Sequence, residues 1–442
     1  MKIILLSGGS GKRLWPLSND ARSKQFLKVL KSPDGTKESM IQRVVRQITT
    51  ASLTEEITIA TGANQQEAIE IQLGDTISVV TEPCRRDTFP AIMLATAFLA
   101  SKGTTNDEPV IVMPCDSFTD DGYFTAIGKM AEAINDSMAD IVLMGIEPTY
   151  PSTKYGYIVP NHEATEEGVM PVKKFTEKPD VQTAQRLIAE GALWNGGVFG
   201  FRLGYLIDIA IQIMKGLDLS CSDDRDLYAT ILANYAIMPK ISFDYAIVEK
   251  AKAVAVVPYS GQWKDLGTWN VLTEELSDII NGDVVAKECV GSYMINELGI
   301  PMVCIGSENM VIAATPDGIL VTDRNKSEYL KDLIGSERRP MCEHRTWGEY
   351  RIIDCEESED GFISLTKKVS LEAEQFFSYQ YQNLTSQILT IIDGEGEFIL
   401  KEEKKKVKRG DVIEITHNDK EFALRATTPL TFIEVQTGWN IE

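Results

Sequence analysis

The sequence lacks any long hydrophobic run. No apolar stretch within its 442 residues approaches the roughly 18 to 20 residues that cross a bilayer. Near the N-terminus, only Ile3 to Leu6 precede the polar turn Ser7-Gly8-Gly9, and this is far shorter than the apolar part of a secretory signal. We therefore expect a cytoplasmic protein that has neither a membrane-spanning segment nor a membrane partner.

Paired cysteines and clustered histidines are also missing. The seven cysteines are odd in number and form no C-x-x-C pair, and the three histidines (His162, His344 and His417) are far apart. A disulfide framework or a zinc site would need such pairs or clusters. We expect reduced thiols and no structural zinc.

Positive charge is scarce, since 44 Lys and Arg face 65 Asp and Glu for a net charge of −21. A surface of this sign repels nucleic acid, which is excluded as a partner, and a small anionic ligand would need a local basic pocket. The Lys-rich run 401–409 also contains glutamates and is expected to be a solvated hairpin face. The other proportions, 43% hydrophobic and 25% charged, are typical of a globular protein.

The hydrophobic pattern divides the chain into three parts. Residues 1–280 alternate short β-branched runs with helical patterns, which indicates an α/β domain around a largely parallel sheet. Residues 281–336 contain short strand-like pieces and form a β-rich connector, and residues 341–442 are all β by pattern. In this last part, Asp393-Gly394-Glu395-Gly396 predicts a hairpin between the strands on either side.

A glycine-rich loop follows the first predicted strand, with the sequence Ser7-Gly8-Gly9-Ser10-Gly11-Lys12-Arg13-Leu14. Ligands bind beyond the carboxyl ends of strands in open α/β sheets, and glycines let the backbone approach a polyphosphate closely. The spacing fits neither a Walker A loop nor a dinucleotide fingerprint, which disfavours an ATPase or an NAD enzyme. Taken alone, the loop also fits a glycine-containing turn beside basic side chains at the surface.

Two aspartates could hold a metal ion. Asp116 follows the apolar run 110–114, and Asp265 lies in a Gly- and Trp-bearing turn after the run 254–258. Magnesium is commonly bound by one or two carboxylates together with phosphate oxygens of the substrate, so this pair would suffice. Taken singly, each aspartate also fits a turn or a helix cap.

Eight motifs occur in order along the chain. They are Leu6–Leu17, Lys24–Leu27, Glu82–Ala91, Tyr155–Ile158, Phe175–Pro179, Leu193–Phe199, Ile241–Ala246 and the Asp265 turn. Together they resemble the mannose-1-phosphate guanylyltransferases over most of the chain. The resemblance implies a Rossmann-like nucleotidyltransferase domain with a mixed sheet, a connector like a short left-handed β-helix, and the reaction of GTP with α-D-mannose 1-phosphate to GDP-mannose and pyrophosphate.

The resemblance also implies a role for each matching residue. Arg13 would stabilise the leaving pyrophosphate, Lys24 would bridge the α-phosphate and the attacking phosphate, and Asp116 and Asp265 would hold Mg²⁺. The nucleotide would be bound by Gly8, Gly9, Ser10, Gly11, Arg86, Asp87, Thr88 and Asp116. The sugar phosphate would be bound by Gly156, Glu177, Lys178 and Asn195.

Three positions depart from the family pattern. Asp87 stands where many relatives have Asn, and either side chain accepts from guanine, so GTP remains compatible. Ser117 replaces a histidine that has no metal-binding role in this scheme. Residues Arg86, Asp87 and Thr88 belong to the loop that would face the nucleotide base, called the base loop below. Arg85 replaces a glycine in this loop and adds charge near the nucleotide.

The C-terminal part resembles the cupin-type phosphomannose isomerase domain of longer relatives. The resemblance rests on Arg345–Tyr350, Gly410–Ile413 and Ile433–Gly438. The segment that aligns with the family's histidine-rich metal ligands, Gln380–Gln387, contains no histidine. We therefore expect a cupin-like domain that lacks its metal ligands and does not isomerise sugars.

Two alternatives to a GTP-dependent guanylyltransferase remain open. One is a related pyrophosphorylase that uses another hexose 1-phosphate or another nucleotide. The other is a sugar-nucleotide-binding protein without activity, although such a protein would not need to retain Arg13, Lys24, Asp116 and Asp265. The connector resembles the segment through which relatives pair, which predicts a homodimer, and plain packing of the β-rich domain onto the catalytic domain is the alternative.

Overall fold

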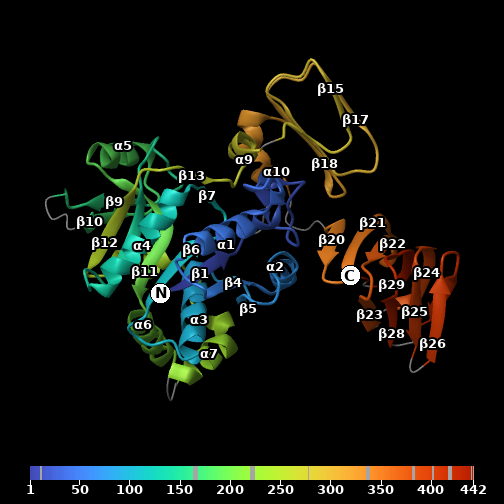
Figure 1. The fold of residues 1–442 in the computed structure, drawn as a ribbon, viewed down its shortest axis with the longest axis horizontal. Coiled ribbons are helices and arrows are strands. Elements are labelled where there is room, and N and C mark those ends of the chain that lie inside the picture. The colour runs from blue at the N-terminus through green and yellow to red at the C-terminus, as the bar shows by residue number, and fades with distance from the viewer. Residues whose placement is uncertain are drawn as a thin grey trace. The chain divides into compact units, whose positions relative to one another are not determined.

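The computed structural model describes residues 1–9, 12–162, 168–219, 224–276, 278–334, 339–380, 384–400, 403–416, 421–439 and 441. They form two compact units (Figure 1). The first comprises Met1–Ser10 and Ser23–Ser277, and the second comprises Gly11–Arg22 and Asp278–Glu442. Within these described ranges, no helix is both long enough and apolar enough to span a membrane.

The first unit is built on a nine-stranded sheet. In spatial order its strands are β5 (Ser78–Glu82), β4 (Ile57–Gly62), β1 (Lys2–Ser7), β6 (Pro109–Pro114), β11 (Leu193–Arg202), β8 (Ile141–Ile146), β12 (Val254–Tyr259), β10 (Met170–Thr176) and β9 (Tyr157–Pro160). Strand β1 is parallel to β4 and β6, whereas β11 is antiparallel to β6 and β8. The mixed sheet is thus confirmed: most strands run in the direction of β1, as a largely parallel sheet requires, whereas β11 and β10 run against their neighbours.

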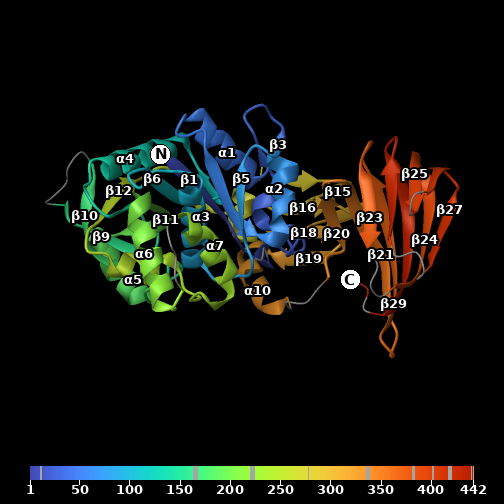
Figure 2. The same ribbon diagram turned by 90° about the horizontal axis from the view of Figure 1, so that it is seen from below.

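Helices cover both faces of this sheet (Figures 1 and 2). One face packs against α1 (Met40–Thr50), α4 (Asp121–Asn135) and α5 (Val181–Ala189). The other packs against α3 (Thr88–Ser101), α6 (Leu203–Gly216) and α7 (Asp224–Ala233). The alternation within β1 follows from the pleat, since Ile3 and Leu5 enter the first core and Ile4 enters the second.

Local sequence explains where two of these helices begin. The Ser39 hydroxyl accepts from the Gln42 backbone N–H, and the Gln42 side chain accepts from the Ser39 N–H, a reciprocal pair that starts α1. Helix α3 begins after Asp87, whose carboxylate accepts from the Thr88 N–H. Both helices agree with the helical patterns expected within residues 1–280.

The connector lies in the second unit and contains short strands. Three of them stack in parallel, β14 (Ile280–Asn281), β16 (Tyr293–Asn296) and β18 (Met310–Thr315), and β19 (Gly318–Asp323) pairs antiparallel with the last. A second parallel pair is β15 (Val284–Lys287) with β17 (Met302–Ile305). The expected β-rich connector is confirmed, and it ends in a 3-10 turn (Arg324–Tyr329) and α10 (Leu330–Leu333).

The C-terminal part contains two sheets. One has the order β20 (Cys342–Arg345), β21 (Gly348–Glu357), β22 (Phe362–Leu371), β29 (Leu430–Trp439), β24 (Leu384–Asp393) and β27 (Val412–Thr416). The other has the order β23 (Phe376–Gln380), β28 (Glu421–Ala426), β25 (Glu395–Leu400) and β26 (Glu403–Lys408). Side chains from both sheets share one core, so the all-β prediction is confirmed.

The predicted hairpin at Asp393–Gly396 is wrong. Strand β24 pairs with β27 and β29, whereas β25 pairs with β26 and β28, so the turn carries the chain from one sheet to the other. Gly394 has a φ of 86°, and a Cβ there would collide with the Pro429 carbonyl oxygen. A close backbone approach, rather than a two-residue hairpin, explains this glycine.

Candidate active site

A lysine and two aspartates from distant parts of the first unit form one cluster. The Lys24 Nζ atom lies 2.7 Å from Asp116 Oδ2 and 2.9 Å from Asp265 Oδ1. Asp116 follows β6 and directly precedes β7 (Ser117–Thr119), and β13 (Trp263–Asp265) pairs antiparallel with β7 so that Asp265 lies opposite Ser117. This short pair of strands brings the two carboxylates to the same ammonium group.

The cluster keeps Lys24 protonated. Burial on its own would lower the pKa of this ammonium, but the charges of Asp116 and Asp265 and their hydrogen bonds outweigh burial and raise the pKa above its usual value. Space is tight around it, because a Cβ at Gly267 would lie 2.9 Å from Asp265 Oδ1 and 3.3 Å from Lys24 Nζ. A fixed positive charge therefore stands between two carboxylates.

The same two carboxylates suit a magnesium ion. They are hard oxygen donors, and each contacts Lys24 through one oxygen, so the second oxygen of each remains to coordinate a cation. Within the described ranges, no group of three or more His, Cys, Asp or Glu side chains could enclose a metal. The donor set thus fits an ion that completes its shell with substrate phosphates and water, rather than a closed metal site.

A cavity of about 620 Å³ opens beside this cluster. Its lining includes Gly8 and Gly9, the loop from Glu82 to Thr88, and Asp116, Gly197 and Asp244. The volume lies in the range of pockets that hold small-molecule ligands. The glycine loop, the predicted base loop and one predicted metal ligand therefore share one cavity in the first unit.

Buried polar side chains hold the glycine loop in place through hydrogen bonds. The Gln65 Nε2 atom donates to the Gly9 carbonyl at 3.2 Å and to Ser23 Oγ at 2.7 Å, and its Oε1 accepts from Gln25 and from Thr61, both at 3.1 Å. All four polar side chains are almost fully buried. Because every hydrogen-bonding group of the Gln65 amide is used, the position of Gly9 is firmly set.

The base loop is held in a constrained conformation. Asp87 has a φ of 70°, which few residues other than glycine adopt, and its Oδ1 accepts from the Thr88 N–H at 2.7 Å. The Thr88 hydroxyl accepts from the Phe243 N–H at 2.9 Å, and Arg86 donates to the Ala236 carbonyl. The loop is thus anchored to residues 236–243 and presents Asp87 at the cavity.

A second polar group lies near Gly156. The Glu177 Oε1 atom pairs with Lys178 Nζ at 2.8 Å, and the Asn195 N–H donates to the Gly156 carbonyl at 2.8 Å. Glu177 is only 5% exposed, and its Oε2 has no hydrogen-bond partner among the described residues. A Cβ at Gly156 would collide with this oxygen, so the glycine keeps open a place where Glu177 can accept from a ligand hydroxyl.

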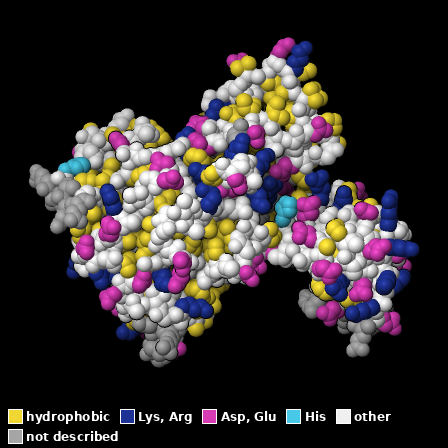
Figure 3. All heavy atoms as spheres, in the orientation of Figure 1, with side chains coloured by type: hydrophobic (Ala, Val, Ile, Leu, Met, Phe, Trp, Pro, Cys, Tyr) yellow, Lys and Arg dark blue, Asp and Glu magenta, His cyan; other side chains and the backbone are white. Residues whose placement is uncertain are grey.

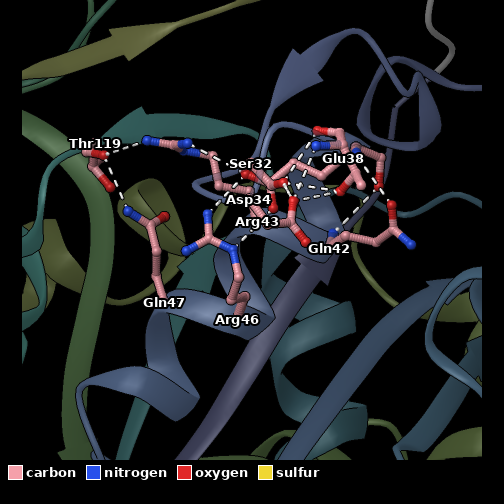
Figure 4. A network of polar contacts seen from close by, with 10 residues as sticks. Ser32, Asp34, Glu38, Gln42, Arg43, Arg46, Gln47 and Thr119 are labelled. Carbon is pink, nitrogen blue, oxygen red and sulfur yellow. Dashed lines mark hydrogen bonds and ion pairs between the residues drawn. The ribbon is translucent and has the colours of Figure 1, made fainter.

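A polar network outside the cavity supports β7. Glu38 is buried and binds Arg46 through two hydrogen bonds of 2.8 and 3.0 Å, and it also pairs with Arg43. Arg43 and Gln47 on α1 then donate to the Thr119 carbonyl (Figure 4). The network ties α1 to the strand that pairs with the Asp265 strand.

Residues 2–282 match the family model described as nucleotidyl transferase, which covers more than half of the chain. The chain belongs to the nucleotidyl transferase family. It is therefore an enzyme of the class predicted from its motifs.

Several relatives are similar to this nucleotidyl transferase over nearly its whole length. Mannose-1-phosphate guanylyltransferase from Salmonella muenchen and the xanthan biosynthesis protein XanB from Xanthomonas campestris pv. campestris (strain B100) are each 30% identical, over 98% of this chain and 95% of the relative. A crystal structure from Thermus thermophilus, described as a mannose-1-phosphate geranyltransferase, is 28% identical. It has a TM-score of 0.61 and covers 75% of this chain and 97% of that one.

The structure brings together most of the predicted site residues of this nucleotidyl transferase. Lys24, Asp116 and Asp265 form one cluster, Gly8, Gly9, Arg86, Asp87 and Thr88 line the cavity, and Gly156, Glu177, Lys178 and Asn195 form the second polar group. Ser10 and Gly11 lie outside the described residues. Arg13 belongs to the second unit, where its side chain is exposed.

Asp244 was not predicted as a site residue. It lines the cavity and accepts from Asn195 Nδ2 at 2.6 Å. Burial, and next the charge of Glu177, raises the pKa of Asp244 to about 6. The motif Ile241–Ala246 contains this residue, but only the folded chain shows that its carboxylate meets Asn195.

The raised pKa of Asp244 predicts a pH-dependent difference in stability. The pKa rises from 3.8 in the unfolded chain to about 6, so the wild-type carboxyl favours folding fully below pH 4 and loses that advantage as pH rises through 6. We expect the melting temperature of wild type to fall relative to that of Asp244→Asn between pH 4 and pH 7. The corresponding free-energy change is about 3 kcal/mol at most.

The exposed Asp107 supplies the matched control. The difference in melting temperature between wild type and Asp107→Asn should stay constant across the same pH range. Melting curves measured in steps of half a pH unit test the expectation. A constant difference between wild type and Asp244→Asn would show that Asp244 titrates as an ordinary carboxyl.

Proposed function

We propose that this nucleotidyl transferase converts GTP and α-D-mannose 1-phosphate to GDP-mannose and pyrophosphate. The observation that carries the proposal is the Lys24 ammonium held between Asp116 and Asp265, beside a cavity lined by the glycine loop and the base loop. The relative from Salmonella that bears the name of this activity is similar over nearly its full length.

The reaction needs positioning and charge, not a covalent intermediate. An oxygen of the sugar phosphate attacks the α-phosphorus of GTP, and the bond from that phosphorus to the bridging oxygen breaks on the opposite side to release pyrophosphate. A phosphate monoester is already anionic near neutral pH, so no general base is required. Lys24 stays charged between its two carboxylates and can reduce the repulsion between the two phosphates.

The proposal includes Mg²⁺ held by Asp116 and Asp265. When bound, the ion neutralises phosphate charge and helps to orient the triphosphate. In this proposal, Gly8 and Gly9 lie against the nucleotide. Gln65 and Ser23 donate hydrogen bonds to the Gly9 carbonyl, so they orient the loop without competing with the ligand. Arg13 would contact the triphosphate and stabilise the leaving group.

Substrate selection is assigned to two places. At the cavity, Asp87 accepts hydrogen bonds from the ring N–H and the amino group of guanine. On the other side, hydrogen bonds to the sugar hydroxyls come from Glu177, Asn195 and the Gly156 backbone. Lys178 binds the sugar phosphate. The Glu177 Oε2 atom, which has no hydrogen-bond partner in the part of the chain that the structure describes, and the nearby Asp244 support a hydroxyl-binding role on this side.

The second candidate is a pyrophosphorylase for another nucleotide or hexose 1-phosphate. Arg85 and Asp87 both line the cavity and differ from the family pattern, so a change of nucleotide substrate would arise at these two positions. Competition decides between the candidates: GTP consumption is measured with each other nucleoside triphosphate or hexose 1-phosphate present. If only analogues of GTP and of mannose 1-phosphate strongly inhibit GTP consumption, guanylyl transfer to mannose is supported. If another nucleoside triphosphate and another hexose 1-phosphate compete better, they are identified as the alternative substrates.

A homodimer through the connector is part of the proposal, as is a cytoplasmic location. Hydrophobic side chains gather on the connector (Figure 3), including Val303 at 63%, Ile305 at 70% and Ile319 at 63% exposure. An apolar surface of this kind on a folded unit suggests a partner. Sedimentation of wild type against Ile305→Lys tests it, because a monomeric wild-type chain would exclude the dimer.

The C-terminal β domain is not expected to isomerise sugar phosphates. The sheet that contains β22, β24 and β29 carries four buried polar side chains, which are Lys367, Glu434, Gln387 and Gln436. Lys367 on β22 lies opposite Glu434 on β29 in the strand register. This group offers one carboxylate, two amides and no imidazole, which are not the donors that a divalent transition metal needs, and His417 lies outside the described residues. The likeness to a cupin stays a prediction, whereas the donor set does not fit the metal of that family.

We expect purified protein to show no conversion of fructose 6-phosphate to mannose 6-phosphate when Zn²⁺, Mn²⁺ or Co²⁺ is added. A coupled assay with a metal-dependent isomerase as positive control measures this. Turnover that rises above background with added metal and disappears in Glu434→Gln would contradict the assignment.

A further inference from the structure

The segment that carries Arg13 packs in the second unit. Residues 12–22 lie there although they join two parts of the first unit along the chain. Leu14 and Leu17 are fully buried, and Trp15 lies so close to Gly318 that a Cβ at this glycine would collide with the indole ring. The Thr315 hydroxyl donates to the Pro16 carbonyl at 3.0 Å, so β18 and the turn before β19 form one wall of the segment.

One chain of hydrogen bonds links this segment to the start of the C-terminal β domain. The Asn19 Oδ1 atom accepts from the Ala21 and Arg22 N–H groups at 2.9 and 2.6 Å, and this closes the turn. The Asn19 Nδ2 atom donates to Asp317 Oδ2 at 2.8 Å, and Asp317 Oδ1 accepts from the Met341 N–H at 2.7 Å. Asp317 thus joins the turn to the residue that precedes β20.

A second chain runs in parallel through Glu297. Its carboxylate binds the Arg22 guanidinium through two hydrogen bonds of 2.8 and 3.0 Å, the paired geometry that fixes direction as well as distance. The Glu297 carbonyl accepts from Arg351 Nη2 on β21 at 3.1 Å. Burial opposes the charge of Arg22, but its hydrogen bond to Glu297 and the charges of Glu297 and the nearby Asp317 outweigh burial and raise its pKa.

We propose that the C-terminal β domain braces the Arg13 segment through Asp317 and through Glu297 with Arg351. The inference rests on the proposed function for its catalytic consequence, because Arg13 is the phosphate contact that the brace would position. Asn19, Arg22, Asp317, Glu297 and Arg351 are positioning residues. A domain that lacks its metal ligands then retains a role, since its contacts hold the turn at residues 19–22 within the second unit.

The chemistry of the reaction makes such a brace useful. An arginine stabilises a leaving pyrophosphate only where its fork meets the developing charge, and a displacement of about 1 Å can cost about a hundredfold in rate. Arg13 is exposed and lies in a 3-10 turn of three residues, Lys12–Leu14, which holds little rigidity of its own. Its position must therefore come from the contacts of residues 15–22.

Arg351→Ala tests the brace in the full-length protein, with hydrogen exchange and kinetics measured on the same preparation. We expect amide exchange in a peptide covering residues 12–22 to rise at least about fivefold, while peptides from the core of the first unit stay unchanged. We expect kcat to fall about tenfold with less than a twofold change in the KM for mannose 1-phosphate. Arg351→Lys, which keeps a donor, should recover part of both effects.

Arg425→Ala is the matched control, since it removes a partly exposed arginine that pairs with Glu374 in the same domain. It should change neither readout. Asn19→Ala serves as the second variant if Arg351→Ala does not fold, because it cuts the other chain of hydrogen bonds from within the turn.

Unchanged exchange over residues 12–22 would overturn the brace, and faster exchange with wild-type kcat would overturn its catalytic role. If the wild-type chain forms no GDP-mannose, the proposed function fails, and the exchange comparison by itself then decides whether the C-terminal domain holds the segment.

Discussion

Asp116→Ala is expected to lower the rate of GDP-mannose formation at least about a thousandfold. The variant removes one of two proposed magnesium ligands and one of the two carboxylates that hold Lys24, so both the metal and the ammonium lose their fixed positions. Initial rates of pyrophosphate release at saturating GTP and mannose 1-phosphate, with Mg²⁺ in excess, measure the effect.

Asp116→Asn adds a finer test, because it keeps the shape of the side chain and one oxygen while it removes the charge. It should retain more activity than the alanine variant and require more Mg²⁺ for half-maximal rate. Asp107→Ala, at a carboxylate that is 92% exposed, is the control and should match wild type. Near wild-type turnover in Asp116→Ala, with the fold intact by circular dichroism, would mean that the cluster is not the reaction centre.

Arg13→Ala is expected to lower kcat by about a hundredfold to a thousandfold. The guanidinium would bind the pyrophosphate as negative charge develops on it, an interaction that is stronger in the transition state than in the bound substrate. The KM values should change much less than kcat. Since the side chain is exposed, its loss should not change the melting temperature.

Arg13→Lys separates charge from geometry, because lysine keeps the charge but cannot form the paired hydrogen bonds of arginine. We expect a rate between those of wild type and the alanine variant. Arg202→Ala, at an arginine that binds Asp107 and the Asn135 carbonyl, is the control for loss of a partly exposed arginine. If Arg13→Ala raised only the KM for GTP, Arg13 would assist binding and not departure of the leaving group.

Much of the site could be predicted because its chemistry lies in short motifs. Asp116 follows an apolar strand, Gly8 and Gly9 follow the first strand, and both positions lie at strand ends where ligands bind in α/β sheets. The assignment of Lys24 came from the family resemblance. Its contact with both aspartates could not be predicted, because it depends on the pairing of β7 with β13 from residues far apart in the sequence.

Other features had no local signal. Gln65 supports the Gly9 carbonyl and Asp244 meets Asn195 only once the strands and loops that carry them are packed together. The turn at Gly394 has the composition of a hairpin, yet burial of two facing sheets sends β24 and β25 to different sheets. In each case a tertiary contact decides what a pattern of residue types leaves open.

The placement of residues 12–22 in the second unit is the clearest example. Their sequence continues the glycine loop and contains its basic residues, which favours assignment to the catalytic domain along with the rest of residues 1–280. Asn19 and Arg22 instead find their partners Asp317 and Glu297 almost 300 residues later. No spacing rule connects these positions, so only the folded chain shows that the connector holds this segment.

The identity of the reaction products decides whether this nucleotidyl transferase forms GDP-mannose. Purified full-length protein is incubated with GTP, mannose 1-phosphate and Mg²⁺, and the products are separated and identified by mass spectrometry. We expect GDP-mannose and pyrophosphate in equal amounts, with no turnover when a chelator removes the metal. Bound GTP without either product, in a protein shown to be folded, would contradict this expectation and leave a binding protein in place of an enzyme.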